Sequence, residues 1–482
     1  MDESIAQDDQ VFAGKSVRGM FEGPIPGLLA RLAFPVFTGM FFQLLYSLVD
    51  TLYISRIDMA DPSYVGGTGM VFPLIFIIIA LSSGLLIGTS ALVARSIGEK
   101  NREVLDKTAE SGLVVGLALG TLLVVFGYIF DDGIIGLLGA RGDYYTHALE
   151  YFRYMLPAGF LMIAGNVLNG ILQGEGLMKR VMTAMIIGTA TNIVLDPVFI
   201  FLLGMKVEGA GLATSLSQVV VAAYVLGLFI RKKTLVPIHW KVANVNFEIV
   251  KRIVSVGFPQ TLGQLTMSVS FLIFNRIIVG IDSLAMTAFT ICGRFDQFII
   301  MPILSIGTAL VTMIGQNYGR GNLRRVKDIW KTCVIAAVGT AALLAVVLFI
   351  FVPVIYPVFT RVDQVLRYAV RQTRIVIFSF TFVAVVIIVR AAFQSMGKPL
   401  PGFVIDVMRL LLIGVPMAFF YVNVLDLGVH GVWLGMITGN FVAAAVGILW
   451  VRGYFGRVLE GKGRRVSSGI TFRCAFSRRG SR

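Results

Sequence analysis

The chain has 482 residues, of which 56% are hydrophobic and only 14% are charged, and its mean hydropathy is +0.83. A soluble globular protein carries about 25% charged residues, so this composition excludes a soluble fold and predicts a membrane protein. The formal net charge of +15 has two common explanations, nucleic-acid binding or membrane topology. The positions of the charges along the chain decide between them.

Twelve apolar stretches follow one another along the chain, and each can cross a bilayer, which takes about 20 to 25 helical residues. They use most of the sequence and leave no room for a sizeable domain outside the membrane. The sequence therefore predicts an all-α polytopic membrane protein with twelve transmembrane helices. The predicted spans are residues 27–56, 64–94, 108–130, 148–173, 181–203, 209–230, 250–280, 285–316, 328–356, 368–396, 401–424 and 429–451.

The loops between these spans alternate in charge. Loops after even-numbered spans are basic, as at 95–107 and 231–252, whereas loops after odd-numbered spans are acidic or nearly neutral, as at 58–61 and 131–143. Because Lys and Arg accumulate in cytoplasmic loops, both termini are predicted to be cytoplasmic. Topology thus accounts for the basic charge, and we expect the lipid bilayer, and not nucleic acid, as a partner.

An internal repeat divides the chain into two halves. Because an even number of spans separates the copies, they share one orientation, which predicts two six-helix bundles related by a pseudo-two-fold axis along the membrane normal. The matched positions are Gly98 with Gly319, Asn101 with Asn322, Gln173 with Gln394 and Gly176 with Gly397 at a shift of 221 residues, and Phe34-Pro35 with Phe258-Pro259 at a shift of about 224.

This repeat sets the predicted domain organisation. A cytoplasmic N-terminal segment covers 1–26, the first bundle covers 27–230 and a basic cytoplasmic linker covers 231–249. The second bundle covers 250–452. The remaining segment, 453–482, is basic and Gly/Ser-rich without helical periodicity, and we expect a disordered cytoplasmic tail there.

Two acidic residues inside the spans of the first half point to a functional site, because a charge at the bilayer centre costs about 2.5 to 3.5 kcal/mol on insertion scales. Asp50 shares one face of the first span with Gln43 and Tyr46, at spacings of seven and four residues. Asp196 lies in the fifth span with Asn192 one turn earlier. Two acids with amide or hydroxyl neighbours predict a proton or sodium site, whereas the alternative is a pair of helix-end carboxylates at the membrane interface.

Other charges inside the spans suggest structural roles. Long side chains near span ends can reach the interface, and opposite charges close in sequence can pair. The first class comprises Arg276 and Arg390, and the second comprises Arg294 with Asp296 and Asp406 with Arg409. At the positions that the repeat matches to Asp50 and Asp196, the second half has Phe274 and Met417, so the acidic site is expected in the first bundle alone.

The chain lacks the common motifs of catalysis. No phosphate-binding loop, H-E-x-x-H zinc motif or G-x-S-x-G nucleophile turn occurs in the sequence, so we expect no enzymatic activity and no cofactor. An intramembrane aspartyl protease would also use two aspartates, but it needs a G-x-G-D context, and the second acid here lies in Leu195-Asp196-Pro197. A scaffold or receptor that transports nothing would have no reason to retain buried carboxylates.

The sequence resembles the multidrug and toxic compound extrusion (MATE) transporters from about residue 25 to 452. The segments GLLIGTSALVARSIGEKNREVLDK (84–107) and IGQNYGRGNLRRVK (314–327) are similar to the family's second span and its counterpart in the second half. The cation-site pattern of the DinF-like branch is matched by Pro35, Gln43, Tyr46, Asp50, Asn192, Asp196 and Thr214.

This resemblance implies a secondary antiporter of the inner membrane. It would export amphipathic, often cationic, drugs or metabolites in exchange for protons or sodium ions, by alternating access of two bundles, and would act as a monomer. The implied cation-coupling residues are Asp50, Asp196, Asn192, Gln43, Tyr46 and Thr214, with Pro35 as a hinge and with Asp50, Asn192, Asp196 and Thr214 as possible sodium ligands. The alternative with the same architecture is a flippase for a lipid-linked oligosaccharide.

Overall fold

The computed structural model describes residues 15–58, 61, 63–239, 245–358 and 362–459. Within these residues every regular element is helical. Twelve helical stretches are long and apolar enough to cross a membrane: Ile25–Ser55, Ser63–Gly98, Arg102–Ile129, Asp143–Gly174, Met178–Leu202, Lys206–Ile230, Phe247–Ile281, Ser283–Gly319, Leu323–Ile355, Asp363–Ser395, Leu400–Asn423 and Val429–Arg457. The prediction of an all-α membrane protein with twelve spans is confirmed.

The first half of the chain forms one bundle, called the N-lobe below. Its spans are α3 (Ile25–Ser55), α4 (Ser63–Met70) with α5 (Phe72–Gly98), α6 (Arg102–Ile129), α8 (Asp143–Gly174), α9 (Met178–Pro197) with the π-helical turn η1 (Val198–Leu202), and α10 (Lys206–Ile230). Two short helices lie outside the spans, α2 (Lys15–Glu22) before the first span and α7 (Asp131–Leu137) before α8.

The second half forms the C-lobe. Its spans are α11 (Phe247–Ile281), α12 (Ser283–Gly319), α13 (Leu323–Ile355) followed by η3 (Tyr356–Val358), α14 (Asp363–Val376) with η4 (Ile377–Ser379) and α15 (Phe380–Ser395), α16 (Leu400–Val407) with η5 (Met408–Gly414) and α17 (Val415–Asn423), and α18 (Val429–Leu459). Helix α18 runs through 453–459, which were expected in the disordered tail, and residues 460–482 lie outside the described residues.

The repeat is visible in local geometry. The Asn101 side chain caps α6 by accepting a hydrogen bond from the backbone N–H of Val104 at 3.1 Å, and Asn322 caps α13 from the N–H of Arg325 at 3.4 Å. Gly176 and Gly397 both adopt a left-handed conformation, with φ of 81° and 73°, which favours glycine. The cap and the turn thus recur at the shift of 221 residues that the sequence gives.

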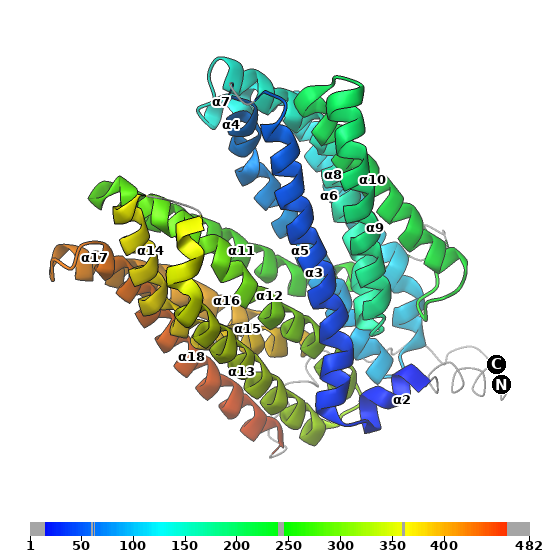
Figure 1. Cartoon of the computed structure of the whole chain (residues 1–482). Helices are drawn as coiled ribbons and strands as arrows, with labels where there is room; N and C mark the ends of the chain where they lie inside the picture. The colour runs from blue at the N-terminus through cyan, green and yellow to red at the C-terminus, as the bar shows by residue number, and fades with distance from the viewer. Residues whose placement is uncertain (1–14, 59–60, 62, 240–244, 359–361, 460–482) are drawn as a thin grey trace, which may run out of the picture.

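The two lobes touch at one end and diverge at the other. Figure 1 shows them as the two arms of a V that meet near α2, and we call this meeting end the inner end and the open end the outer end. The contact extends from this end toward the middle of the spans, where helices α5 and α11 approach closely: a Cβ added to Gly257 would lie 2.5 Å from the carbonyl oxygen of Gly84. The Thr261 hydroxyl also donates to the Ala80 carbonyl at 3.0 Å across this contact.

Apolar packing continues this contact on the other side of the inner end. The first turns of α3 belong to the same hydrophobic cluster as the middle of α12, with Leu32 and Val36 on α3 and Leu310 and Met313 on α12, all buried. Pro35 lies in this packed part of α3 and is also buried. The inner half of α3 therefore belongs structurally to both lobes.

Candidate functional site

Asp50 and Asp196 meet inside the N-lobe, from helices α3 and α9. Their carboxyl groups interact directly with one another, and Asp196 is fully buried. Asp196 precedes Pro197, the last residue of α9, and the chain then makes the π-helical turn η1. Because Pro has no N–H to donate, the regular helical ladder is interrupted beside this carboxylate.

Hydroxyl and amide groups from neighbouring helices surround the two acids. The Tyr46 and Thr214 hydroxyls are 3.3 Å apart, and the Asn192 Nδ2 donates to Thr214 Oγ1 at 3.3 Å. The Asn192 side chain also interacts with Asp196. Five of the six residues expected in the cation-coupling set therefore come together, from α3, α9 and α10.

Several buried oxygens of this site lack a hydrogen-bond donor among the described residues. They are Asp50 Oδ1, both carboxylate oxygens of Asp196 and Asn192 Oδ1. No Lys or Arg side chain of the described residues forms an ion pair with either acid. Two buried carboxylates without a basic partner need a positive charge between them. A proton or a small hard cation with oxygen ligands suits this arrangement.

Gln43 and Pro35 lie apart from the acids. Gln43 is exposed, and no hydrogen bond joins it to the site among the described residues. Pro35 lies about four turns before Asp50, inside an uninterrupted α3, in the part that packs against α12. Whether either residue takes part in coupling stays a prediction.

Tyr151 is a member of the site that the sequence analysis missed. This residue of α8 is 5% exposed and interacts electrostatically with Asp50, Asp196 and Tyr46. Its signal in the sequence is weak, because one hydroxyl in an apolar span is also compatible with a position at the membrane interface. With Tyr151, four of the N-lobe helices contribute to the site.

The charges of the C-lobe pair differently from the expectation based on sequence spacing. Asp406 forms its ion pair with Arg390 of α15, with Arg390 Nη1 and Asp406 Oδ2 at 3.0 Å, and not with Arg409 three residues later. The Nε of Arg409 is buried without a hydrogen-bond partner among the described residues. No ion pair joins Arg294 to Asp296 either. Helix α16 ends at Val407, one residue after Asp406, and the π-helical segment η5 that follows contains Arg409, which alters the i, i+3 geometry that the prediction assumed.

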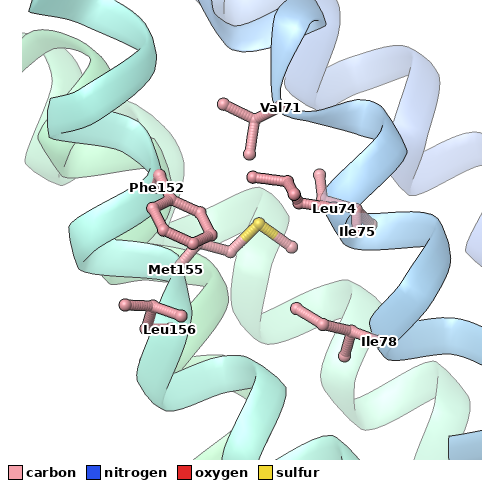
Figure 2. Close-up of a pocket in the computed structure, with 7 residues that line it drawn as sticks. All are labelled: Val71, Leu74, Ile75, Ile78, Phe152, Met155 and Leu156. Carbon is pink, nitrogen blue, oxygen red and sulfur yellow. The ribbon is translucent and has the colours of Figure 1, made fainter. Parts of the chain in front are cut away.

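A small pocket inside the N-lobe lies beside the acidic site but has no polar group. Figure 2 shows its side chains converging from α5 and α8, with the Met155 sulfur pointing into the space between them. Met155 is one turn from Tyr151 on α8. Because every lining residue is apolar, this pocket is packing space and not an ion site. The lining residues are Val71, Leu74, Ile75, Ile78, Phe152, Met155 and Leu156.

The inner end is closed by two reciprocal contacts. Gln316 of α12 reaches into the N-lobe, where its Nε2 donates to the Gly174 carbonyl at 2.9 Å. Arg95, which the repeat matches to Gln316, reaches into the C-lobe and lies against Gly397, where a Cβ would collide with its guanidinium. Each lobe therefore inserts one polar side chain into the turn between the fourth and fifth spans of the other lobe.

Helix α2 covers the same seam. Met20 is 2% exposed, and its carbonyl accepts hydrogen bonds from Asn317 Nδ2 at 3.1 Å and from Arg325 Nε at 3.3 Å. The Arg320 guanidinium stacks over the Phe21 ring at 4.3 Å. All three partners belong to the C-lobe, although α2 leads into the first span of the N-lobe.

Twelve membrane spans in two repeated lobes, a buried acid pair in one lobe and a closed seam at one end define the class of protein as a polytopic membrane transporter. The MatE family model matches residues 35–198 and 259–420, one stretch in each half. The chain therefore belongs to the MatE family, the multidrug and toxic compound extrusion transporters. The resemblance seen in the sequence and the absence of an enzymatic role are confirmed.

Two relatives of this chain are a multidrug resistance protein and a multidrug export protein. The chain is 25% identical over 435 residues to the probable multidrug resistance protein NorM of Thermotoga maritima, covering 88% of this chain and 91% of that protein. It is 24% identical over 315 residues to the multidrug export protein MepA of Staphylococcus aureus, covering 65% of this chain and 69% of that protein.

Solved structures share the arrangement of both lobes. An outward-facing MATE family transporter superposes with a TM-score of 0.87 at 32% identity, covering 92% of this chain and 98% of that chain. The transporter ClbM in complex with Rb⁺ superposes with a TM-score of 0.81 at 34% identity, covering 89% and 95%. The predicted two-bundle fold is confirmed.

Proposed function

We propose that the protein is a secondary antiporter that exports amphipathic, cationic drugs or metabolites and takes up protons or sodium ions at the Asp50–Asp196 pair. The observation that carries this proposal is the pair itself, buried between spans with no basic residue beside it among the described residues. No other group of the N-lobe offers such a concentration of buried acceptor oxygens among the described residues. Multidrug transport by the relatives supports the substrate class.

The position of Pro35 supports a coupling route from this pair to the seam. Binding a proton or a sodium ion removes negative charge between Asp50 and Asp196 and changes the hydrogen bonds around Tyr46 and Thr214. Asp50 and Pro35 share helix α3, and the part around Pro35 packs against α12. Because Pro35 leaves the carbonyl of Arg31 without its helical donor, α3 can bend there. A bend in α3 would then shift one lobe against the other.

In the proposed orientation the protein lies in the cytoplasmic membrane, and its inner end faces the cytoplasm. Basic residues collect around this end, including Arg252, Arg320 and Arg325, which agrees with the retention of positive charge on the cytoplasmic side. The contact at the inner end and the divergence at the outer end then correspond to an outward-facing state (Figure 1). A monomer suffices for this mechanism, because both lobes and the ion site belong to one chain, and no cofactor or nucleic acid enters it.

Efflux from proteoliposomes tests the proposal. A dye cation is loaded, and its export is followed first under a pH gradient alone and then under a sodium gradient alone. Export driven by one gradient supports antiport and identifies the ion, and export driven by neither contradicts it. Rescue of a cell that lacks its lipid-linked oligosaccharide flippase, without any dye export, would favour the flippase alternative.

A further inference from the structure

Asp296 is a second acid deep in the membrane-spanning region, and it belongs to the C-lobe. It lies 13 residues after Ser283, where α12 begins at the outer end, so it is about 20 Å along the helix axis at 1.5 Å per residue. In a hydrocarbon core about 30 Å thick, this depth is closer to the middle than to the surface. An ionisable residue at such a depth needs an explanation.

The face of α12 that carries Asp296 points into the C-lobe. Gly315 and Gly319 of α12 contact the N-lobe, and Arg294 precedes them by 21 and 25 residues, which places it on the same helical face at 3.6 residues per turn. Asp296 is two residues further on, about 200° around the helix. This opposite face also carries Cys292 and Ile299, which are 2% and 0% exposed. Arg294 is exposed and therefore points away from Asp296.

The side chains that interact with Asp296 are a thiol and a tyrosine hydroxyl, and both of them contact the hydroxyl of Thr373. The acid interacts electrostatically with Cys292 of its own helix and with Tyr356 of η3. The Tyr356 hydroxyl is 2.6 Å from Thr373 Oγ1 of α14, and Cys292 Sγ is 3.5 Å from the same Thr373 oxygen. Tyr356, Thr373 and Cys292 are all buried.

No positive charge balances this acid among the described residues. Asp296 takes part in no ion pair there, and no Lys, Arg or His interacts with it electrostatically. The titratable groups that face it are Cys292 and Tyr356, and both are neutral when protonated. Asp296 is half-buried. The fully buried acid of the C-lobe, Asp406, is by contrast paired with Arg390.

We propose that Asp296 is a second proton-binding carboxyl group, which gives the C-lobe its own coupling site. This site lies on α12, whereas the repeat would place it on α11 or α17, at the positions matched to Asp50 and Asp196. Its proton comes from water on the outer side and converts the carboxylate into a neutral carboxylic acid. When α12 changes its position, the acid releases this proton and becomes a carboxylate again. No other bond changes in the cycle.

The surroundings favour a proton over a metal cation. Sodium prefers several hard oxygen ligands, but the hydroxyls of Tyr356 and Thr373 bond to one another and the third neighbour is the soft sulfur of Cys292. A carboxyl group needs only one proton and no ligand shell to become neutral. The hydroxyl pair also offers a hydrogen-bonding partner for the protonated form.

The proposal rests on the proposed antiport function, and it predicts a different stoichiometry. With two proton sites, wild-type protein takes up one more proton per exported substrate than the Asp296→Asn variant, which still transports through Asp50 and Asp196. The measurement is the ratio of proton uptake to dye efflux in proteoliposomes. The matched control is Asp282→Asn, a half-buried acid outside the membrane-spanning helices that caps the start of α12 and accepts a hydrogen bond from Tyr368, which leaves the ratio unchanged. An equal ratio in wild type and Asp296→Asn overturns the proposal.

A spectroscopic measurement separates this proposal from the antiport function. Infrared difference spectra of the purified protein between acidic and alkaline pH record the C=O band of each carboxyl group that gains a proton. Asp296→Asn loses one component of this band, Asp50→Asn loses another, and Asp296→Glu keeps a shifted component. If wild type shows no ion-driven efflux but the Asp296 component is present, antiport fails and the proton site stands. If Asp296→Asn leaves the band unchanged, the proton site fails whatever the transport assay gives.

Discussion

Gly98 of α5 and Gly319 of α12 each lie directly against the backbone of the other's helix. A Cβ on Gly98 would collide with the Gln316 carbonyl, and a Cβ on Gly319 would collide with the Arg95 carbonyl. The repeat matches Gly98 to Gly319 and Arg95 to Gln316. The two close contacts are therefore equivalent and are related by the pseudo-two-fold symmetry of the lobes. The inner seam is therefore a local two-fold contact whose closeness depends on the absence of side chains.

This contact predicts that Gly319→Ala weakens the closed seam. The obstacle is backbone and cannot move aside, so one added methyl group should push the inner ends apart and cost about 1 to 3 kcal/mol, as overpacking does. We expect a lower melting temperature and faster labelling, from the side of the inner end, of a cysteine introduced as Ala94→Cys. The matched control is Gly339→Ala, a helical glycine of α13 with nothing within 4 Å of its added Cβ. Equal melting and labelling in both variants would contradict the seam as the site of closure.

The acid pair predicts loss of transport without loss of folding. Asp50→Asn and Asp196→Asn each remove one buried carboxylate from a pair that has no basic partner among the described residues, so no charge is stranded by either change. We expect both variants to be well expressed, to melt at or above the wild-type temperature and to lose the efflux that is coupled to ion binding at this pair. Thr214→Ala keeps both acids and loses the hydroxyl near Tyr46 and Asn192, and its defect should be smaller. Wild-type efflux by Asp50→Asn at normal expression would rule out the pair as the coupling site.

Sequence spacing predicted the fold of this chain well, because the bilayer imposes it locally. Span length, loop charge and the repeated caps at Asn101 and Asn322 each depend on a few neighbouring residues, and the structure has them where the sequence places them. The meeting of Asp50 with Asp196 was expected only because each is an expensive charged residue inside a span. The pattern within one helix cannot say which helices face each other.

The errors arose where pairing depends on three-dimensional geometry. Asp406 has Arg409 three residues later in sequence, but the π-helical turn η5 changes the helical phase and Arg390 of another helix forms the pair. Arg294 and Asp296 are two residues apart, which is too close in a helix for one face to hold both. Tyr151 was missed because its partners come from other helices.

The ion pair of the C-lobe predicts a defect in stability. Asp406 is 3% exposed, and Asp406→Asn leaves the Arg390 guanidinium without its partner, which costs about 3 to 5 kcal/mol for a buried pair. We expect a lower melting temperature and lower expression, with normal efflux per folded molecule. The control is the double variant Asp406→Asn with Arg390→Gln, which removes the stranded charge and should recover much of the stability. Full loss of efflux at normal stability would show that Asp406 itself carries ions.

The contacts of helix α2 with the C-lobe predict that α2 restrains the opening of the inner end. Its Met20 carbonyl is held by Asn317 and Arg325 of the C-lobe, so α2 must release these groups before the lobes separate there. Arg325→Gln removes a charged donor and should increase labelling of Ala94→Cys from the side of the inner end. Arg324→Gln changes a neighbouring arginine that makes no hydrogen bond to α2 among the described residues, and it should leave labelling as in wild type. A reduced or unchanged labelling rate in Arg325→Gln would mean that α2 does not hold the seam.

The burial of the Glu175 carboxyl group predicts that the stability of the folded protein falls as the pH rises. This residue follows the end of α8, is 3% exposed, and accepts a hydrogen bond from the backbone N–H of Val236 at 2.9 Å. Burial raises the pKa of Glu175 to about 7, from an ordinary value of 4.5. Between these two values the folded protein holds a proton that the unfolded chain has released, so stability is greatest below pH 4.5 for this group and declines up to about pH 7.

The total change from this one group is on the order of 3 kcal/mol, at about 1.4 kcal/mol for each pH unit. Glu175→Gln keeps an oxygen that can accept from Val236 but has no proton to lose, so its melting temperature should not decline over this interval and should exceed that of wild type at pH 8. The measurement is the melting temperature of purified wild type and variant at half-unit steps from pH 4.5 to 8, compared as a difference so that other titrating groups cancel. A difference that stays constant across the interval would show that Glu175 is ionised in the folded protein throughout. The hydrogen bond from Val236, in the linker before α11, would then be accepted by a carboxylate.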